Sequence, residues 1–175
     1  DFIKNCIDWL AMHKMNVFHW HLTDNEGWRI EIKKYPELTR TGAWRGPNEK
    51  LQPTFCSGYY RYGGFYTQEQ IREVVGYAAK RQVMIMPEIE VPGHSRAVAA
   101  AYPEILCDYI DPGKHELSQN SWCAANERGY EILGDILKEV AGLFPCPYIH
   151  IGGDEVEMEY WENCRRCHRL GSAVR

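Results

Sequence analysis

The chain has 175 residues, with 20 basic and 24 acidic side chains and a net charge of −4. This length is enough for one ordinary domain with a hydrophobic core. No basic stripe stands out, which excludes nucleic acid and anionic membrane surfaces as expected partners. No apolar stretch reaches the length that spans a bilayer. The chain starts at Asp1 without an initiator Met or a signal peptide and stops after a helical pattern at Arg175, so we expect both ends to be cuts through a larger fold.

Helical and strand patterns alternate along the chain. In chain order, we expect a helix over 1–11, a strand over 17–23, a helix with a capping box over 67–79, a strand over 83–90 that Pro87 interrupts, a helix opened by Asn126, a strand from Tyr148 and a helix over 157–170. The segments 24–64 and 91–125 are too long for ordinary connections and are predicted to be functional loops.

This alternation predicts parallel strands joined by helical crossovers. A closed (β/α)8 barrel and an open doubly wound sheet both fit the alternation. The long segments follow strands, whereas the helix-to-strand joins are short, as in a barrel whose site lies at the carboxyl ends of the strands. No Gly-rich phosphate motif follows the first strand, which counts against a nucleotide-binding sheet. We therefore favour an α/β fold of TIM-barrel type, of which three strands are present.

Polar residues follow all three predicted strands. Asp154 and Glu155 come directly after a Gly-Gly pair at the end of the third strand. Two adjacent carboxyl groups, partly removed from water, should have separated pKa values, with one protonated and the other charged. Such a pair suits acid catalysis near neutral pH. Asp24 ends the first strand, and Glu90 and His94 follow the second, so we expect them to converge with the pair.

Each of these residues also has a simpler interpretation. Asp24 could cap a turn, and the Gly-Gly-Asp-Glu sequence could be a surface turn. The remaining strand histidines, His19, His21 and His150, are expected to be hydrogen-bonded residues of the core. A mixed metal site is the other alternative, with the ligands His21, Asp24, Glu90, His94 and Asp154. No close ligand pair lies on one element, so we expect neither a metal nor another cofactor.

Seven cysteines are many for this length, but their odd number and scattered spacing indicate no disulfide framework and no compartment. Residues 164–168 match the Cys-x-x-Cys-His pattern of covalent haem attachment. No small helical domain precedes the motif to enclose a haem, so we expect Cys164 and Cys167 to be structural or incidental residues on a surface helix. A zinc half-site would need a second pair, and no other Cys or His pair has the right spacing.

Five motifs in order resemble the β-N-acetylhexosaminidases of glycoside hydrolase family 20 over nearly the whole chain. They are residues 14–24 (KMNVFHWHLTD), 27–29 (GWR), 64–68 (GFYTQ), 87–94 (PEIEVPGH) and 150–155 (HIGGDE). The resemblance implies that residues 1–175 are a partial catalytic (β/α)8 domain, with the second to fourth strands and no second domain.

The resemblance also implies an activity. Such enzymes remove terminal, non-reducing N-acetylglucosamine or N-acetylgalactosamine from glycans with retention at the anomeric carbon, using the acetamido group of the substrate as nucleophile. Carried over, Asp154 orients that acetamido group and Glu155 is the acid. Asp24 and His94 match positions that support the acid, and Glu90 and His150 are counted with them as supporting or substrate-binding residues.

Two departures from the family pattern matter. Glu90 stands where many relatives have Asp. The first strand, with an Arg that binds sugar hydroxyls, and the last four strands, with Trp walls and a Tyr, are not in this sequence. A non-catalytic carbohydrate-binding module or an inactive fragment is therefore the alternative function. A glycan with a terminal N-acetylhexosamine is the expected partner. Export from the cytoplasm is also expected, and the only reason for it is the kind of glycan that the family degrades.

Overall fold

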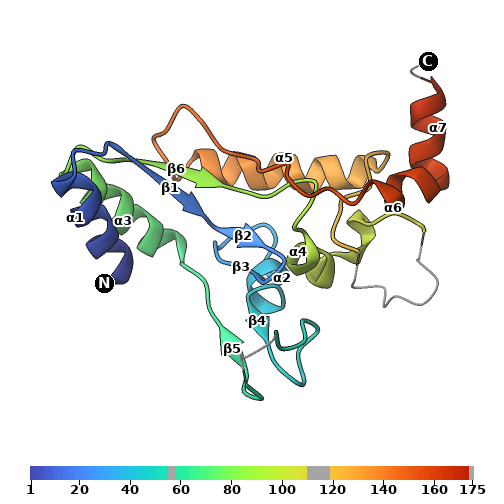
Figure 1. The fold of residues 1–175 in the computed structure, drawn as a ribbon, viewed down its shortest axis with the longest axis horizontal. Helices are drawn as coiled ribbons and strands as arrows, with labels where there is room; N and C mark the ends of the chain where they lie inside the picture. The colour runs from blue at the N-terminus through green and yellow to red at the C-terminus, as the bar shows by residue number, and fades with distance from the viewer. Residues whose placement is uncertain (55–57, 110–118, 174–175) are drawn as a thin grey trace.

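A pair of parallel strands forms the centre of the computed structural model, which describes residues 1–54, 58–109 and 119–173 (Figure 1). Strand β1 (Val17–His21) pairs with β6 (Met84–Glu88) in parallel, with Val17 opposite Met84 and His21 opposite Glu88. The predicted parallel arrangement of these strands is confirmed. Pro87 does not interrupt the second strand; it lies within β6, opposite Trp20.

The third predicted strand is much shorter than expected. His150 forms a single parallel bridge with Glu88, supported by hydrogen bonds from His150 N–H to the Pro87 carbonyl (2.9 Å) and from Ile89 N–H to the His150 carbonyl (3.0 Å). The segment ends there because residues 152 and 153 take up positive φ angles of 67° and 103°. A regular strand from Tyr148 was therefore a wrong prediction, although the single bridge is parallel, as predicted.

Helices cover one face of the strand pair. Helix α1 (Phe2–Met12) and helix α3 (Gln68–Ala79) lie together beside β1 and β6 (Figure 1). Trp20 and Ile85 point to this side and are buried in one core with residues of these helices. The predicted capping box of α3 is confirmed, because Thr67 and Gln70 bond each other's backbone N–H at 3.2 and 2.9 Å. Asn126 caps helix α5 (Glu127–Ala141), as predicted.

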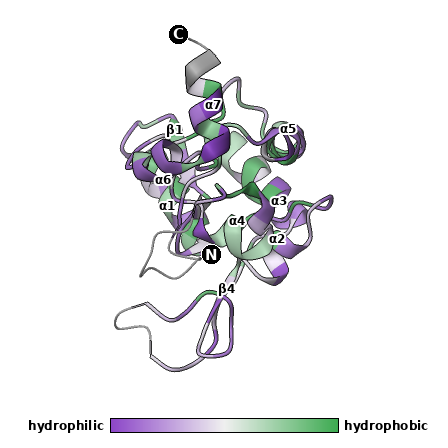
Figure 2. Cartoon of the chain, turned by 90° about the vertical axis from the view of Figure 1, so that its right-hand side faces the viewer, coloured by the Kyte–Doolittle hydropathy of each residue, from purple (hydrophilic) through white to green (hydrophobic). Residues whose placement is uncertain are grey.

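The two long connections contain short elements. The first holds β2 (Thr23–Asp24), β3 (Gly27–Trp28), α2 (Glu37–Arg40), β4 (Trp44–Arg45) and β5 (Tyr62–Gly63). The second holds α4 (Arg96–Ala101) and the 3₁₀ helix η1 (Pro103–Ile105). Figure 2 shows the apolar character of α4, in which residues 97–100 are buried. Positions 55–57 and 110–118 of these predicted loops lie outside the described residues.

The predicted helix over 157–170 is two helices. Helix α6 (Met158–Asn163) and helix α7 (Arg165–Ala173) are separated by Cys164, whose ψ of 123° is extended. Contrary to the expectation of a surface helix, Cys164 and Cys167 are buried. They lie in a second buried cluster with Cys107, Cys123 and Tyr160. Cys107 and Cys123, which are far apart in sequence and lack the spacing of a ligand pair, therefore accompany them in space. Among the described residues, no helix combines the length and apolar composition needed to cross a bilayer.

Candidate active site

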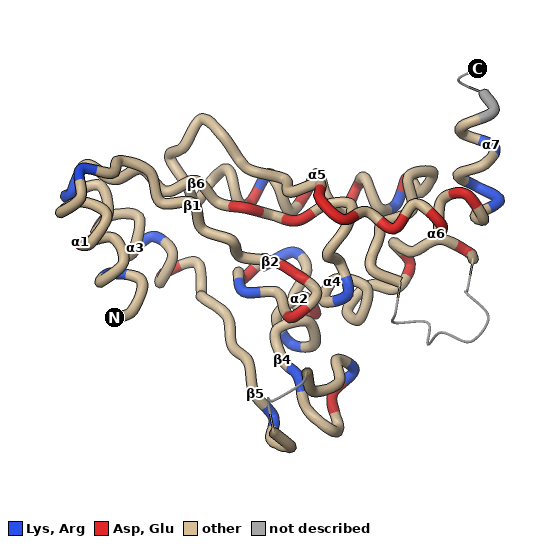
Figure 3. The backbone as a smooth tube through the Cα atoms, viewed as in Figure 1, with Lys and Arg blue, Asp and Glu red and all other residues tan. Residues whose placement is uncertain are grey.

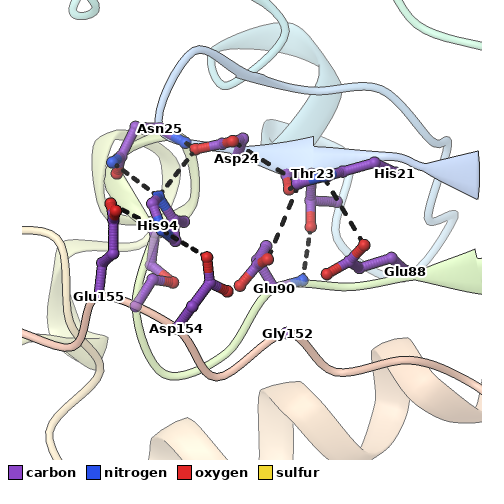
Figure 4. A network of polar contacts seen from close by, with 12 residues as sticks. His21, Thr23, Asp24, Asn25, Glu88, Glu90, His94, Gly152, Asp154 and Glu155 are labelled. Carbon is purple, nitrogen blue, oxygen red and sulfur yellow. Dashed lines mark hydrogen bonds and ion pairs between the residues drawn. The ribbon is translucent and has the colours of Figure 1, made fainter.

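Four polar side chains from three separate turns meet at the carboxyl ends of the strands (Figure 4). His94 lies at their centre, and its side chain is 14% exposed. Its Nδ1 atom is 3.1 Å from Asp24 Oδ1, and its Nε2 atom is 3.6 Å from Asp154 Oδ2 and 3.7 Å from Glu155 Oε2. The structure thus brings together Asp24, His94, Asp154 and Glu155. Figure 3 shows that acidic residues lie close together in space from the end of β6 to α6.

Two glycines allow these turns to pack closely. A Cβ atom on Gly93 would lie 2.9 Å from the carbonyl oxygen of Asp154, so this position joins the turn after β6 to the Asp-Glu turn. A Cβ atom on Gly152, whose φ is 67°, would lie 1.9 Å from Glu90 Oε2. His94 and Glu155 themselves have positive φ angles of 47° and 48°. Non-glycine residues in this region are uncommon and often mark functional sites.

The Asp-Glu pair is more exposed than expected. The side chains of Asp154 and Glu155 are 68% and 80% exposed. The expected partial removal of this pair from water is therefore wrong for the described residues. The physical reason is that the turns after β1, β6 and the His150 bridge form one wall of the site, so that among the described residues the side chains of Asp154 and Glu155 stay open to solvent.

A carboxyl group with a raised pKa lies deeper in the site, at Glu90. The residue is 2% exposed, and burial raises its pKa to about 7, with the hydrogen bond to Glu88 and the charge of Asp154 acting in the same direction. Its backbone N–H donates to Thr23 Oγ1 at 2.8 Å, which ties the segment after β6 to β2. Near neutral pH, Glu90 therefore exists in both protonation states.

Glu88 was not predicted from the sequence as a site residue, yet it organises the strand histidines. It is 4% exposed and contacts His19 Nε2 at 2.5 Å, His150 Nδ1 at 2.9 Å and His21 Nδ1 at 3.7 Å. Burial raises its pKa, but the hydrogen bond from Glu90 and the nearby histidines lower it more, so Glu88 is the ionised member of the Glu88–Glu90 pair. Its place two residues before Glu90, on the same face of a buried strand, was the available signal.

The three strand histidines were expected in the core, but they do not lie there. The side chains of His19, His21 and His150 are each between 43% and 48% exposed. Alternation explains this position, since Phe18 and Trp20 face the helices and their neighbours in sequence face the opposite side of the sheet. These histidines, with Glu88 and Glu90, therefore line the open face of the strand pair.

The mixed metal set weighed from the sequence is not one cluster. Among the described residues, His21 and Glu90 lie in a group with Glu88 whose ligand atoms are within 4.8 Å of one another, and His19, Glu88 and His150 form another such group. Asp24, His94 and Asp154 belong to neither. The contacts of Glu88 in both groups are accounted for as ordinary ion pairs and hydrogen bonds.

A polar site at the carboxyl ends of parallel strands is typical of TIM-barrel enzymes. Comparisons with known proteins agree with this class. Residues 1–173 match Glycosyl hydrolase family 20, catalytic domain. The chain is 49% identical over 172 residues to a beta-hexosaminidase of Vibrio furnissii and 44% identical over 170 residues to one of Porphyromonas gingivalis. These matches cover 96% and 95% of this chain but only 28% and 21% of those proteins.

Solved structures show the same relationship. The crystal structure of the exo beta-N-acetylglucosaminidase from Vibrio harveyi, in complex with N-acetylglucosamine, is similar with a TM-score of 0.89 and 44% identity. The similarity covers 98% of this chain and 28% of that chain. This chain belongs to glycosyl hydrolase family 20. The family assignment confirms the predicted barrel class, of which the described residues form only a part.

Proposed function

We propose that residues 1–175 are the second to fourth strands, with their helices, of the catalytic (β/α)8 barrel of a β-N-acetylhexosaminidase. The complete enzyme removes terminal, non-reducing N-acetylhexosamine residues from glycans. The observation that carries this proposal is the meeting of Asp154 and Glu155 with His94 and Asp24 in a chain of this family. Since the chain spans less than a third of the two bacterial relatives described above, the activity is proposed for the complete protein.

In the first step, the acetamido carbonyl oxygen of the substrate attacks its own anomeric carbon. A new carbon–oxygen bond forms there while the glycosidic bond breaks, and Glu155 donates its proton to the departing oxygen. The product on the enzyme is a cyclic oxazolinium ion. Positive charge develops on its nitrogen, and the Asp154 carboxylate accepts the N–H hydrogen bond and stabilises that charge.

In the second step, water attacks the anomeric carbon and opens the oxazolinium ring. Glu155, now a carboxylate, takes a proton from this water and returns to its starting state. Two displacements at one carbon retain its configuration. The enzyme therefore needs no nucleophile of its own, which fits the division of work between Asp154 and Glu155.

His94 and Asp24 are positioning residues in this proposal. His94 Nε2 is buried, has no hydrogen-bond partner among the described residues, and lies nearly equally far from the two carboxylates. The Asp24 carboxylate contacts the opposite ring nitrogen, Nδ1, and this contact fixes the orientation of the ring. His94 Nε2 can therefore interact with the charge of either carboxylate while Glu155 loses and regains its proton.

The exposure of Asp154 and Glu155 follows from the same proposal. The family resemblance places an Arg on the first strand, and Trp walls and a Tyr on the last four strands, around the sugar. We infer that these strands cover the open face lined by His19, His21 and Glu88. Exclusion of water there would strengthen the interaction of Asp154 with the developing charge.

The test uses the protein encoded by the complete reading frame. A chromogenic aryl N-acetylglucosaminide is compared with the matching aryl glucoside, which has a hydroxyl in place of the acetamido group. We expect hydrolysis of the first with retained configuration, and at least about 100-fold slower hydrolysis of the second, because it has no internal nucleophile. Binding of N-acetylglucosamine without turnover would instead support the non-catalytic carbohydrate-binding alternative, and equal rates on both glycosides would overturn the mechanism.

A further inference from the structure

Four buried cysteines from three segments meet beside helices α6 and α7. Cys107 follows η1, Cys123 precedes α5, Cys164 separates α6 from α7, and Cys167 lies in α7. We propose that these four thiolates bind a structural zinc ion as a closed tetrahedral site. The proposal is independent of the proposed hydrolase activity, because it concerns a cluster separate from the Asp154–Glu155 site.

The distances between the sulfur atoms fit one metal ion. Sγ of Cys123 is 3.5 Å from that of Cys167 and 3.9 Å from that of Cys164, and Sγ of Cys107 is 3.8 Å from that of Cys167. All four sulfur atoms lie within 4.8 Å of one another. A tetrahedral zinc ion with bonds of about 2.3 Å places its sulfur ligands about 3.8 Å apart. The observed cluster has nearly this shape.

The same distances argue against two disulfides. A disulfide bond brings its sulfur atoms to about 2.0 Å and would separate the four atoms into two close pairs. Here Cys167 is nearly as close to Cys107 as to Cys123, so the atoms form one group. These four cysteines are free thiols in the structure.

The surroundings are those of a structural site rather than a catalytic one. Each of the four cysteines is at most 8% exposed, and Tyr160 and Trp161 pack against the cluster. Within the described residues the cluster is therefore almost closed to solvent, and structural zinc sites have all four positions filled by protein. Packing of four thiols as small apolar side chains is the simpler explanation. It does not account for the near-tetrahedral grouping.

A cation, the guanidinium of Arg166, lies beside the cysteine cluster. The guanidinium of Arg166 donates to the Leu106 carbonyl at 2.8 Å and interacts with the charges of Cys123 and Cys164. It would offset part of the charge of a zinc tetrathiolate, which is −2.

The cluster also argues against haem attachment as the function of the Cys-x-x-Cys-His pattern. Covalent haem attachment requires both sulfurs to react with the porphyrin, whereas Cys164 is fully buried. The two sulfurs contact Cys123 and Cys107 instead. A second cysteine pair thus completes the half-site, and it comes from the long connection between β6 and α5. A zinc ion here would join this connection to the helices that follow Asp154 and Glu155.

The test is the metal content of the complete protein, expressed in zinc-supplemented medium and purified without chelator. We expect one zinc ion per chain from this site by mass spectrometry of the metals. The double variant Cys164→Ser/Cys167→Ser should lose it. The variant Cys146→Ser, which removes a cysteine outside the cluster, should keep it and serves as the matched control. Cobalt loaded in place of zinc should give the visible absorption of a tetrahedral thiolate complex.

A second measurement covers the case in which the double variant does not fold. Removal of metal from the unaltered protein by a chelator should lower its melting temperature, and zinc should restore it, because a ligand that binds only the folded state stabilises it. Metal-free protein with four alkylatable thiols and an unchanged melting temperature would overturn the proposal. Stoichiometric iron instead of zinc, or disulfides between these cysteines in peptide maps, would overturn it as well.

Discussion

The raised pKa of Glu90 predicts a pH-dependent stability that one substitution should remove. The usual pKa of a glutamate is 4.5, and that of Glu90 is about 7 in the folded protein. Between these values the folded state binds a proton that the unfolded state has already lost. Stability should therefore fall as pH rises through this window, by about 1.4 kcal/mol per pH unit. The total loss is on the order of 3 kcal/mol, and it is complete above pH 7.

Glu90→Gln removes this titration but keeps a donor for the hydrogen bond to Glu88. The free energy of unfolding of both proteins is measured by urea denaturation at several pH values from 5 to 8, in the complete protein. The stability of the variant relative to the parent should improve steadily from pH 5 to pH 7 and level off above it. Glu26→Gln, which removes an exposed carboxylate from the β2–β3 turn, is the matched control and should show no such trend. A constant difference, or a parent that gains relative stability with pH, would refute the reasoning.

Three further substitutions test other parts of the structure. Asp154→Asn should lower kcat by about 100-fold or more even on activated aryl N-acetylglucosaminides, because the developing charge loses its counter-ion; near-normal rates would contradict its assigned role. Gly152→Ala should lower the free energy of unfolding by at least about 1–2 kcal/mol, the cost of a left-handed alanine. It should also displace Glu90, because the carboxylate of Glu90 occupies the place of the new Cβ. Unchanged stability in urea would show that the turn can rearrange. Thr67→Ala should cost about 1 kcal/mol through loss of the α3 cap, and a melting temperature equal to that of the parent would contradict the role of the capping box.

Features that depend on neighbouring residues were predictable from the sequence. The capping box of α3 and the cap of α5 follow from residue types a few positions apart. The parallel pairing of β1 and β6 follows from the alternation of strands and helices. The convergence of Asp24 and His94 with the Asp-Glu pair follows from the rule that parallel strands end on one side.

Features that depend on contacts between distant segments were not predictable. Nothing in the spacing of Cys107 and Cys123 indicates that they meet Cys164, because both lie far from it in the sequence and only the fold brings them together. Glu88 was missed because its role comes from histidines on two other segments. The third strand shortened to one bridge because the Gly152–Gly153 turn begins directly after it, which local strand propensity does not reveal.

The central claim is that Glu155 acts as the acid in a site whose nucleophile belongs to the substrate. The most direct measurement is the rate of Glu155→Gln in the complete protein on N-acetylglucosaminides with leaving groups of decreasing pKa. The loss relative to the parent should be about 10²–10⁴-fold for a glycan or alkyl leaving group. It should shrink to a small factor for the most acidic phenol, which departs without a proton. An equal loss on all substrates, or no loss on the glycan, would contradict the assignment of Glu155.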